Sequence, residues 1–327
     1  MAQSYSGPNF PLQALVLGRS RSFDKLAVHS APPQSQELTT GEGCGLREKK
    51  GARVNLKAPI QRLSRLQSVR RLYVRLSIAP LVGPALRRLV RRVIPSETRV
   101  WFQISDGLAK GLWVNLDPRY ETSYVEGRYE TVIQSALSQY LASGSVFYDI
   151  GAHIGVVSMY AAQLVGVHGR VFAFEAAPEN ASRLQEHLNR NNLPQIRMIG
   201  CAIWSSRGRV RFERAPAQSS RNGGAVATQT TTERNDTIEI DAVALDDFAR
   251  ENPLPTVIKI DVEGAEADVL RGSEEVFRRA KPVLICEVHN DDAKANVTRW
   301  LEERNYQFDW LEHTLQFPRH LLATPKP

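Results

Sequence analysis

Residues 146–155 read VFYDIGAHIG, and this stretch predicts the fold of the whole chain. Apolar residues lead into Asp149, Gly151 and Gly155 stand four positions apart, and a helix-like segment follows at 156–164. This order is typical of a buried parallel strand, a tight turn and a helix N-terminus. Ligands of open α/β sheets bind just beyond the carboxyl ends of the strands, so we expect the turn to line a binding site.

Strand-like and helix-like segments alternate along the rest of the chain. Strands are expected at 170–174, 196–203, 256–260 and 282–288, and helices at 131–141, 178–191, 245–250, 265–279 and 291–304. Antiparallel pairs are expected at 98–104 with 112–116, at 210–212 with 237–240, and at 307–311 with 314–317. The alternation predicts an α/β fold, with a mostly parallel sheet, helices on both faces and a C-terminal antiparallel hairpin.

Composition divides the chain into three segments. Residues 1–58 are rich in Ser, Gly, Pro and Gln without a sustained period, which predicts a disordered tail. Residues 59–95 carry apolar side chains at helical spacing with arginines between them, which predicts a basic helical arm. This arm either packs its apolar stripe on the body or lies on an anionic membrane surface or nucleic acid. Residues 96–327 are expected to form the folded domain, with its core at 144–317.

The net charge of +7 is distributed unevenly. Basic residues outnumber acidic ones before residue 96, and acidic residues outnumber basic ones after it, unlike a uniformly basic nucleic-acid binder. The three cysteines show no C-x-x-C spacing, so neither a disulfide framework nor a zinc site is indicated. There is no secretory layout and no apolar run near the ~20 residues of a spanning helix. We expect a cytoplasmic protein, with peripheral contact at the inner membrane surface left open by the arm.

Three of the expected strands end in an acidic side chain: Asp149, Glu175 and Asp261. The turn after Asp149 lacks the G-x-G-x-x-G pattern of dinucleotide sites, and the chain contains no P-loop motif. An acid directly before the glycines would repel a phosphate and favour a cationic ligand. S-adenosylmethionine fits because it carries a sulfonium, an α-amino group and ribose hydroxyls. Each acid taken singly has a simpler interpretation as a helix N-cap or a solvated loop residue.

Four motifs together resemble the FkbM family of S-adenosylmethionine-dependent methyltransferases. They lie at 148–155, 174–180, 245–247 and 258–266. The resemblance implies a class I, Rossmann-like fold and methyl transfer to a hydroxyl of a sugar, glycolipid or polyketide-like small molecule. Two positions differ from the family: His153 stands where Asn is usual, and Ala176-Ala177 precedes Pro178 where Glu-Pro is commoner.

The resemblance also implies a cofactor site. The glycine turn would hold the methionine end, Glu175 would bind the ribose hydroxyls, and Asp261 would lie below the sulfonium or face the acceptor. The predicted cofactor-binding set is Asp149, Gly151, His153, Gly155, Glu175, Ala202 and Asp261.

Methyl transfer to a hydroxyl needs an aligned acceptor and a base that removes the hydroxyl proton. His289 is the first candidate because its unperturbed pKa lies near neutrality, and the simpler interpretation is a histidine that fixes its loop. Asp261 and Glu263 follow the preceding strand and complete the predicted catalytic set. Lys259, inside an apolar strand, is expected to pair with a neighbouring acid rather than to act in catalysis.

The acceptor side is predicted from residues ahead of the central strand. Tyr124, Tyr129 and Glu130 are predicted to contact the substrate, with core packing as the alternative for the tyrosines.

Two further alternatives remain open at this stage. Asp261, Glu287 and His289 could hold a divalent metal, but no ligand spacing supports such a site, so no metal ligand is predicted. The function could also be that of an RNA methyltransferase that uses the basic arm, or of a catalytically silent membrane-surface adaptor. The preferred partner is a small-molecule or glycan hydroxyl acceptor, and no DNA partner is expected.

Overall fold

The computed structural model describes residues 98–213, 225–226 and 237–327, together with seven isolated helical positions between 72 and 92. The chain separates into Met1–Arg53 and Val54–Pro327, and every described residue belongs to the second unit. The predicted tail lies outside the described residues, as does most of the predicted arm. Within the described part, no helix is both long and apolar enough to cross a membrane.

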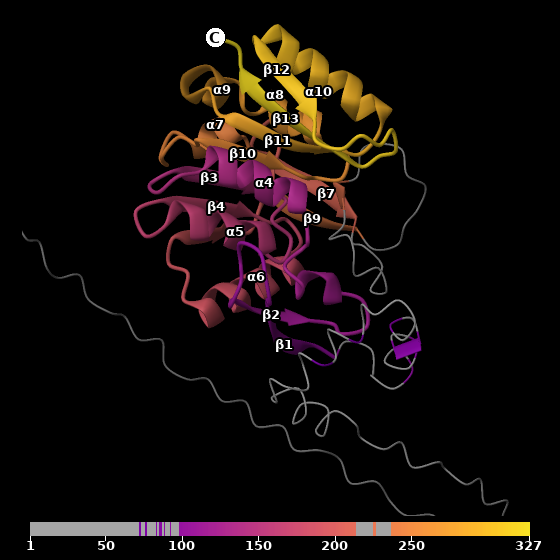
Figure 1. Ribbon diagram of the computed structural model, residues 1–327. Coiled ribbons are helices and arrows are strands. Elements are labelled where there is room, and N and C mark those ends of the chain that lie inside the picture. The colour runs from indigo at the N-terminus through magenta and orange to yellow at the C-terminus, as the bar shows by residue number, and fades with distance from the viewer. Residues whose placement is uncertain are drawn as a thin grey trace, which may run out of the picture. The chain divides into compact units, whose positions relative to one another are not determined.

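A seven-stranded sheet forms the centre of the described part of the second unit (Figure 1), in the order β12-β13-β11-β10-β3-β4-β5. From β5 to β11 all neighbours pair in parallel, while β13 runs antiparallel to both β11 and β12. This arrangement confirms the predicted fold class. The bounds are β3 Val146–Ile150, β4 Arg170–Phe174, β5 Ile196–Ile199, β10 Val257–Ile260, β11 Val283–Val288, β12 Tyr306–Trp310 and β13 Arg319–Pro325.

The chain order reverses beside β3. From β3 it proceeds outward through β4 to β5 and then returns to β10 on the other side of β3. Such a switch point leaves a crevice at the carboxyl ends of the two strands that diverge there, and this crevice is where ligands bind in open α/β sheets.

Helices cover both faces of the sheet because its strands alternate side chains between two apolar clusters. Phe147 packs in the cluster formed with α4 Thr131–Tyr140, α5 Val156–Val165 and α6 Pro178–Asn191. Tyr148, the next residue, packs on the opposite face, in a second cluster. The helices of that face are α7 Leu245–Phe248, α8 Glu266–Arg271, α9 Glu274–Ala280 and α10 Asp291–Glu303.

Two smaller sheets flank the central one. The predicted pair at 98–104 and 112–116 is confirmed as β1 Val100–Gln103 and β2 Trp113–Leu116. A buried ion pair joins the segment after β2 to α6, since Arg183 on α6 lies 2.9 Å from the carboxylate of Glu121. The second small sheet has the order β6-β9-β7-β8. It consists of β6 Ala202–Ile203, β7 Gly208–Glu213, β8 Ala225–Val226 and β9 Thr237–Val243.

Three predicted elements differ from the structure. The strand expected at 196–203 is two strands in two different sheets, β5 and β6. The helix expected at 265–279 is broken into α8 and α9 at Gly272, where an added Cβ would lie 2.1 Å from the Trp204 carbonyl oxygen. The last strand lies at 319–325 instead of 314–317, which belongs to the connecting loop.

A buried ammonium group joins the two strands at the switch point. Lys259 on β10 pairs in register with Asp149 on β3, and its Nζ lies 3.6 Å from Asp149 Oδ1 and 3.0 Å from Asp261 Oδ2. Ser158 on α5 donates a 2.5 Å hydrogen bond to Asp149 Oδ2. Burial would lower the pKa of Lys259, but Asp261 and Asp149 raise it above its ordinary value. The predicted pairing of Lys259 with an acid is confirmed.

Replacing this lysine tests how much of the fold depends on it. Lys259→Met leaves Asp149, which is fully buried, without a cation and should reduce the free energy of unfolding by ~3–5 kcal/mol. Chemical denaturation at pH 7 measures this loss. Lys294→Met, on an exposed position of α10, should change stability by less than about 0.5 kcal/mol. Equal stability of the two variants would contradict the central role of Lys259.

Candidate active site

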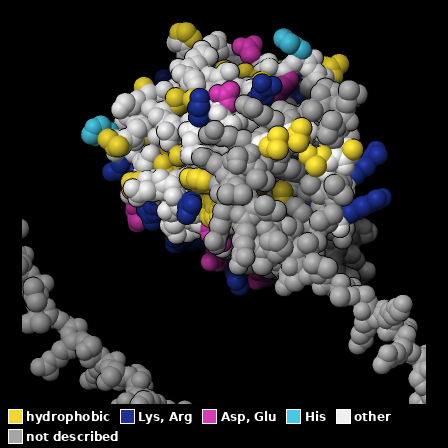
Figure 2. Space-filling view, turned by 60° about the horizontal axis from the view of Figure 1, so that its bottom comes forward, with side chains coloured by type: hydrophobic (Ala, Val, Ile, Leu, Met, Phe, Trp, Pro, Cys, Tyr) yellow, Lys and Arg dark blue, Asp and Glu magenta, His cyan; other side chains and the backbone are white. Residues whose placement is uncertain are grey.

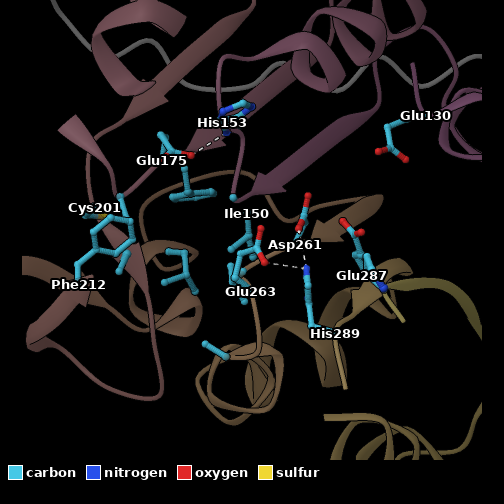
Figure 3. Close-up of a pocket in the computed structure, with 18 of the residues that line it drawn as sticks. Glu130, Ile150, His153, Glu175, Cys201, Phe212, Asp261, Glu263, Glu287 and His289 are labelled. Atoms are coloured by element: carbon cyan, nitrogen blue, oxygen red, sulfur yellow. Dashed lines mark hydrogen bonds and ion pairs between the residues drawn. The ribbon is translucent and has the colours of Figure 1, made fainter. Parts of the chain in front are cut away.

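A cavity of about 260 Å³ lies where β3, β4, β10 and β11 end (Figure 3). The turns after these strands form most of its wall. The segment ahead of α4 and the sheet that contains β6 and β7 contribute further residues. The residues that line it include Tyr129, Glu130, Ile150, Gly151, His153, Glu175, Cys201, Ala202, Ile203, Phe212, Asp261, Glu263, Glu287 and His289.

The two glycines of the first turn have different tasks. Gly151 has a φ of 79°, and a Cβ on it would lie 1.8 Å from the Asp261 carbonyl oxygen. It therefore lets the turn after β3 touch the turn after β10 at the cavity wall. Gly155 does not line the cavity. A Cβ there would lie 2.8 Å from Leu184 Cγ on α6, so Gly155 allows close packing of α5 on α6.

The Glu175 carboxylate meets the backbone of His153 at the end of β4 (Figure 3). Glu175 Oε2 accepts a 2.7 Å hydrogen bond from the His153 backbone N–H, and Oε1 accepts one of 2.9 Å from Ala177 N–H. Burial raises the pKa of Glu175 to about 7. Burial, helped by the charge of Arg183, lowers the pKa of His153 to about 4, so this imidazole is neutral at pH 7. A carboxylate oxygen has two lone pairs, so Glu175 can also accept a hydrogen bond from a ligand hydroxyl.

Two predicted cofactor residues have different surroundings from each other. Asp149 is fully buried beneath the turn and is absent from the cavity wall, so it acts on the site through Lys259. Ala202 lines an apolar end together with Cys201, Ile203 and Phe212. Phe212 was missed by the sequence analysis. Little in the local sequence indicates that Phe212 lines a site, since it is the one buried residue of β7.

The opposite end of the cavity is acidic. His289 Nε2 lies 3.3 Å from Glu263 Oε2 and 3.7 Å from Asp261 Oδ1, while Nδ1 lies 2.7 Å from Glu266 Oε1. Burial would lower the pKa of His289, but Glu266, Asp261 and Glu263 raise it to about 9. His289 therefore carries its proton at pH 7, and it must lose this proton before it can act as a base.

Asp261 and Glu287 share a hydrogen bond at the same end. Burial would raise the pKa of Asp261, but Lys259, Glu287 and His289 lower it to about 2. Burial, together with the charge of Asp261, raises the pKa of Glu287 to about 9. The shared proton therefore resides on Glu287, and Asp261 is the ionised partner.

Comparison with known proteins assigns a family to this arrangement. Residues 149–308 match the model of the Methyltransferase FkbM domain, and this range begins within β3, ends within β12 and includes most of the cavity wall. Residues 149–308 are an FkbM methyltransferase domain. The family resemblance stated from the motifs is confirmed.

Individual relatives match over part of their length. Hexuronic acid methyltransferase AglP of Haloferax volcanii is 31% identical over 160 residues, which are 48% of this chain and 62% of that protein. Methyltransferase 1 of Beauveria bassiana is 26% identical over 149 residues, 40% of this chain and 59% of that protein. The chain thus spans less than two thirds of either curated relative. The solved FkbM methyltransferase of Methylobacillus flagellatus is 21% identical, with a TM-score of 0.41 over 58% of each chain.

The residues predicted to contact the acceptor lie ahead of α4, and the structure places them differently from one another. Tyr129 and Glu130 line the cavity, whereas Tyr124 is buried behind them with its ring centroid 4.3 Å from that of Tyr129. Core packing therefore describes Tyr124 better than substrate contact. Glu130 Oε2 lies 3.3 Å from Nε2 of His320, a buried residue that the sequence analysis missed because it lies in an apolar strand.

The three side chains considered as a metal site do come together in the FkbM domain. One ligand atom from each of Asp261, Glu287 and His289 lies within 4.8 Å of the other two. The Lys259 ammonium, 3.0 Å from Asp261, and the protons on Glu287 and His289 already offset the charge of these acids. That no metal is bound stays a prediction.

Backbone strain is concentrated at the cavity. Six described residues other than glycine have positive φ, and three of them line the cavity: Glu130 at 53°, His153 at 51° and Glu263 at 55°. Such conformations cost of order 1–3 kcal/mol and tend to occur where function requires them.

The strain at Glu263 can be measured with two variants that both remove its carboxylate. Glu263→Gly relieves the positive φ and Glu263→Ala keeps it, so the glycine variant should be the more stable by about 1 kcal/mol. This reverses the usual order of stability, in which an alanine variant is more stable than a glycine variant. Urea denaturation of both variants measures the difference, and an alanine variant of equal or higher stability would exclude strain at this residue.

Proposed function

We propose that this protein is an S-adenosylmethionine-dependent O-methyltransferase that acts on a hydroxyl of a sugar, glycolipid or polyketide-like small molecule. The observation that carries this proposal is a single cavity with an apolar end, a central carboxylate and an acidic end that contains a histidine. The similarity to a hexuronic acid methyltransferase supports an acceptor of the sugar type.

The residues of the cavity fit this cofactor. Phe212 and Ala202 offer an apolar surface for the adenine, and Glu175 offers acceptor lone pairs to the ribose hydroxyls. Gly151 and Asp261 would hold the methionine end, where the ionised Asp261 suits a positive charge. The cofactor supplies an electrophilic methyl group on a sulfonium.

We assign the removal of the acceptor's hydroxyl proton to His289, which lies beside Asp261 and Glu263. A positive charge bound near Asp261 would lower the pKa of His289 and so release its proton. The neutral imidazole could then take the hydroxyl proton at Nε2. Tyr129 and Glu130 would orient the acceptor from the opposite wall.

Two variants separate cofactor binding from catalysis. His289→Ala should reduce methyl transfer by about 10²–10⁴-fold while the affinity for S-adenosylhomocysteine stays unchanged. Glu175→Ala should weaken that affinity because the ribose loses its acceptor. Isothermal titration calorimetry and transfer of labelled methyl groups to a panel of sugars measure the two effects. His313→Ala, on an exposed loop position, is the matched control. Full turnover by the His289 variant would remove this residue from the mechanism.

The assignment of a histidine base without a metal predicts insensitivity to chelators. Methyl transfer should persist after dialysis against EDTA and should not rise on addition of Mg²⁺ or Mn²⁺. Activity that requires an added divalent cation would instead assign Asp261, Glu287 and His289 to a metal.

Charge on one face of the described part gives no reason to prefer RNA as a partner. Lys and Arg side chains are interspersed with Asp and Glu on the face shown in Figure 2. The basic arm lies outside the described residues for most of its length, and its contact with a membrane stays a prediction.

A further inference from the structure

We infer that Glu266 is a positioning residue that holds His289 with its proton on Nδ1 and with Nε2 directed toward the cavity. This inference rests on the function proposed above, in which His289 is the base. The helix dipole favours an acid in the first turn of a helix. An exposed acidic side chain would already provide this stabilisation. Glu266 is instead fully buried at the start of α8.

The hydrogen bonds of Glu266 determine the tautomer of His289. Glu266 Oε1 accepts a 2.9 Å hydrogen bond from the Gly264 backbone N–H and lies 2.7 Å from His289 Nδ1. An ionised carboxylate oxygen can only accept, so Nδ1 must be the donor. The nitrogen that gains and loses a proton is then Nε2, which is directed toward Glu263 and Asp261 at the cavity wall (Figure 3).

Stability alone does not account for this carboxylate. Glu266 Oε2 is buried and has no hydrogen-bond partner in the part of the chain that the structure describes. A buried polar atom without a partner costs free energy, and an apolar side chain at this position would avoid that cost. Residues that break such a local rule are expected at functional sites.

The charges around His289 come from three elements. Glu266 lies on α8, Asp261 and Glu263 lie in the loop between β10 and α8, and Glu287 lies on β11. The contact with Glu266 at 2.7 Å is shorter than those with Glu263 and Asp261. Removing its charge should therefore change the titration of His289 more than removing a distant carboxylate.

The test compares Glu266→Gln and Glu266→Asp in the full chain. The glutamine variant should lower the pKa of His289 by about 1 unit, because it removes a charge and reverses the donor preference of the partner atom. The acid limb of the pH–rate profile should move to lower pH by the same amount, and the plateau should fall about 10–100-fold through loss of orientation. The aspartate variant should restore part of both effects, with S-adenosylhomocysteine affinity unchanged in each.

Proton NMR of the imidazole Cε1–H signals follows the titration directly. The chain has seven histidines, and the His289 signal is identified by its absence from the His289→Ala variant. Glu274→Gln, which removes an ion-paired carboxylate from α9, is the matched control and should leave the signal unchanged. An unaltered His289 titration in both Glu266 variants would overturn the inference. Because NMR needs no acceptor, the inference can be judged even if no methyl transfer is found.

Discussion

The ammonium group of Lys259, buried between Asp149 and Asp261, is the interaction on which the central part of the structure depends. It requires β10 to pair with β3 in one register, with Lys259 opposite Asp149. A slip of one residue would turn Lys259 toward the apolar cluster that holds Ile258 and Ile260. The charges therefore specify the pairing of two strands whose apolar residues would accept more than one register.

The same ammonium group also determines the charges of the cavity. It keeps Asp261 ionised. Burial together with the ionised Asp261 raises the pKa of Glu287, and Glu266 together with Asp261 raises the pKa of His289. Gly151 adds a steric constraint, since its lack of a Cβ lets the turn after β3 touch the backbone of Asp261. One buried lysine and one glycine thus place an ionised carboxylate at the point where the two strands diverge.

Local sequence patterns were enough to predict most of the sheet and its helices. The helix at 178–191 begins at a proline and carries an acid in its first turn, and both signals are local, so its bounds agree with those of α6. The break at Gly272 depends on the backbone of Trp204, 68 positions away in sequence, and no local pattern encodes that contact. The place of β13 between β11 and β12 is likewise set by tertiary pairing.

The site was predictable to the extent that its residues follow strand ends. Asp261, Glu263, Glu287 and His289 do so, and they meet at one end of the cavity as parallel topology requires. Asp149 shows the limit of this reasoning, because an acid before a glycine turn has the same local signal whether it faces a ligand or a buried lysine. Phe212 lines the cavity and His320 contacts Glu130 from strands outside the parallel core, and only the folded chain shows these two placements.

Charge conservation gives the acidic end a physical role in the proposed reaction. Transfer of a methyl group from a sulfonium to a hydroxyl removes the positive charge from sulfur and releases one proton. If His289 keeps that proton, the positive charge moves from one side of Asp261 to the other, and the total charge beside the carboxylates does not change. Glu263 and Asp261 lie within 3.3 and 3.7 Å of the nitrogen that would receive the proton. In a partly buried site, where charge is poorly screened, this avoids the cost of leaving the carboxylates without a cation when the sulfonium loses its charge.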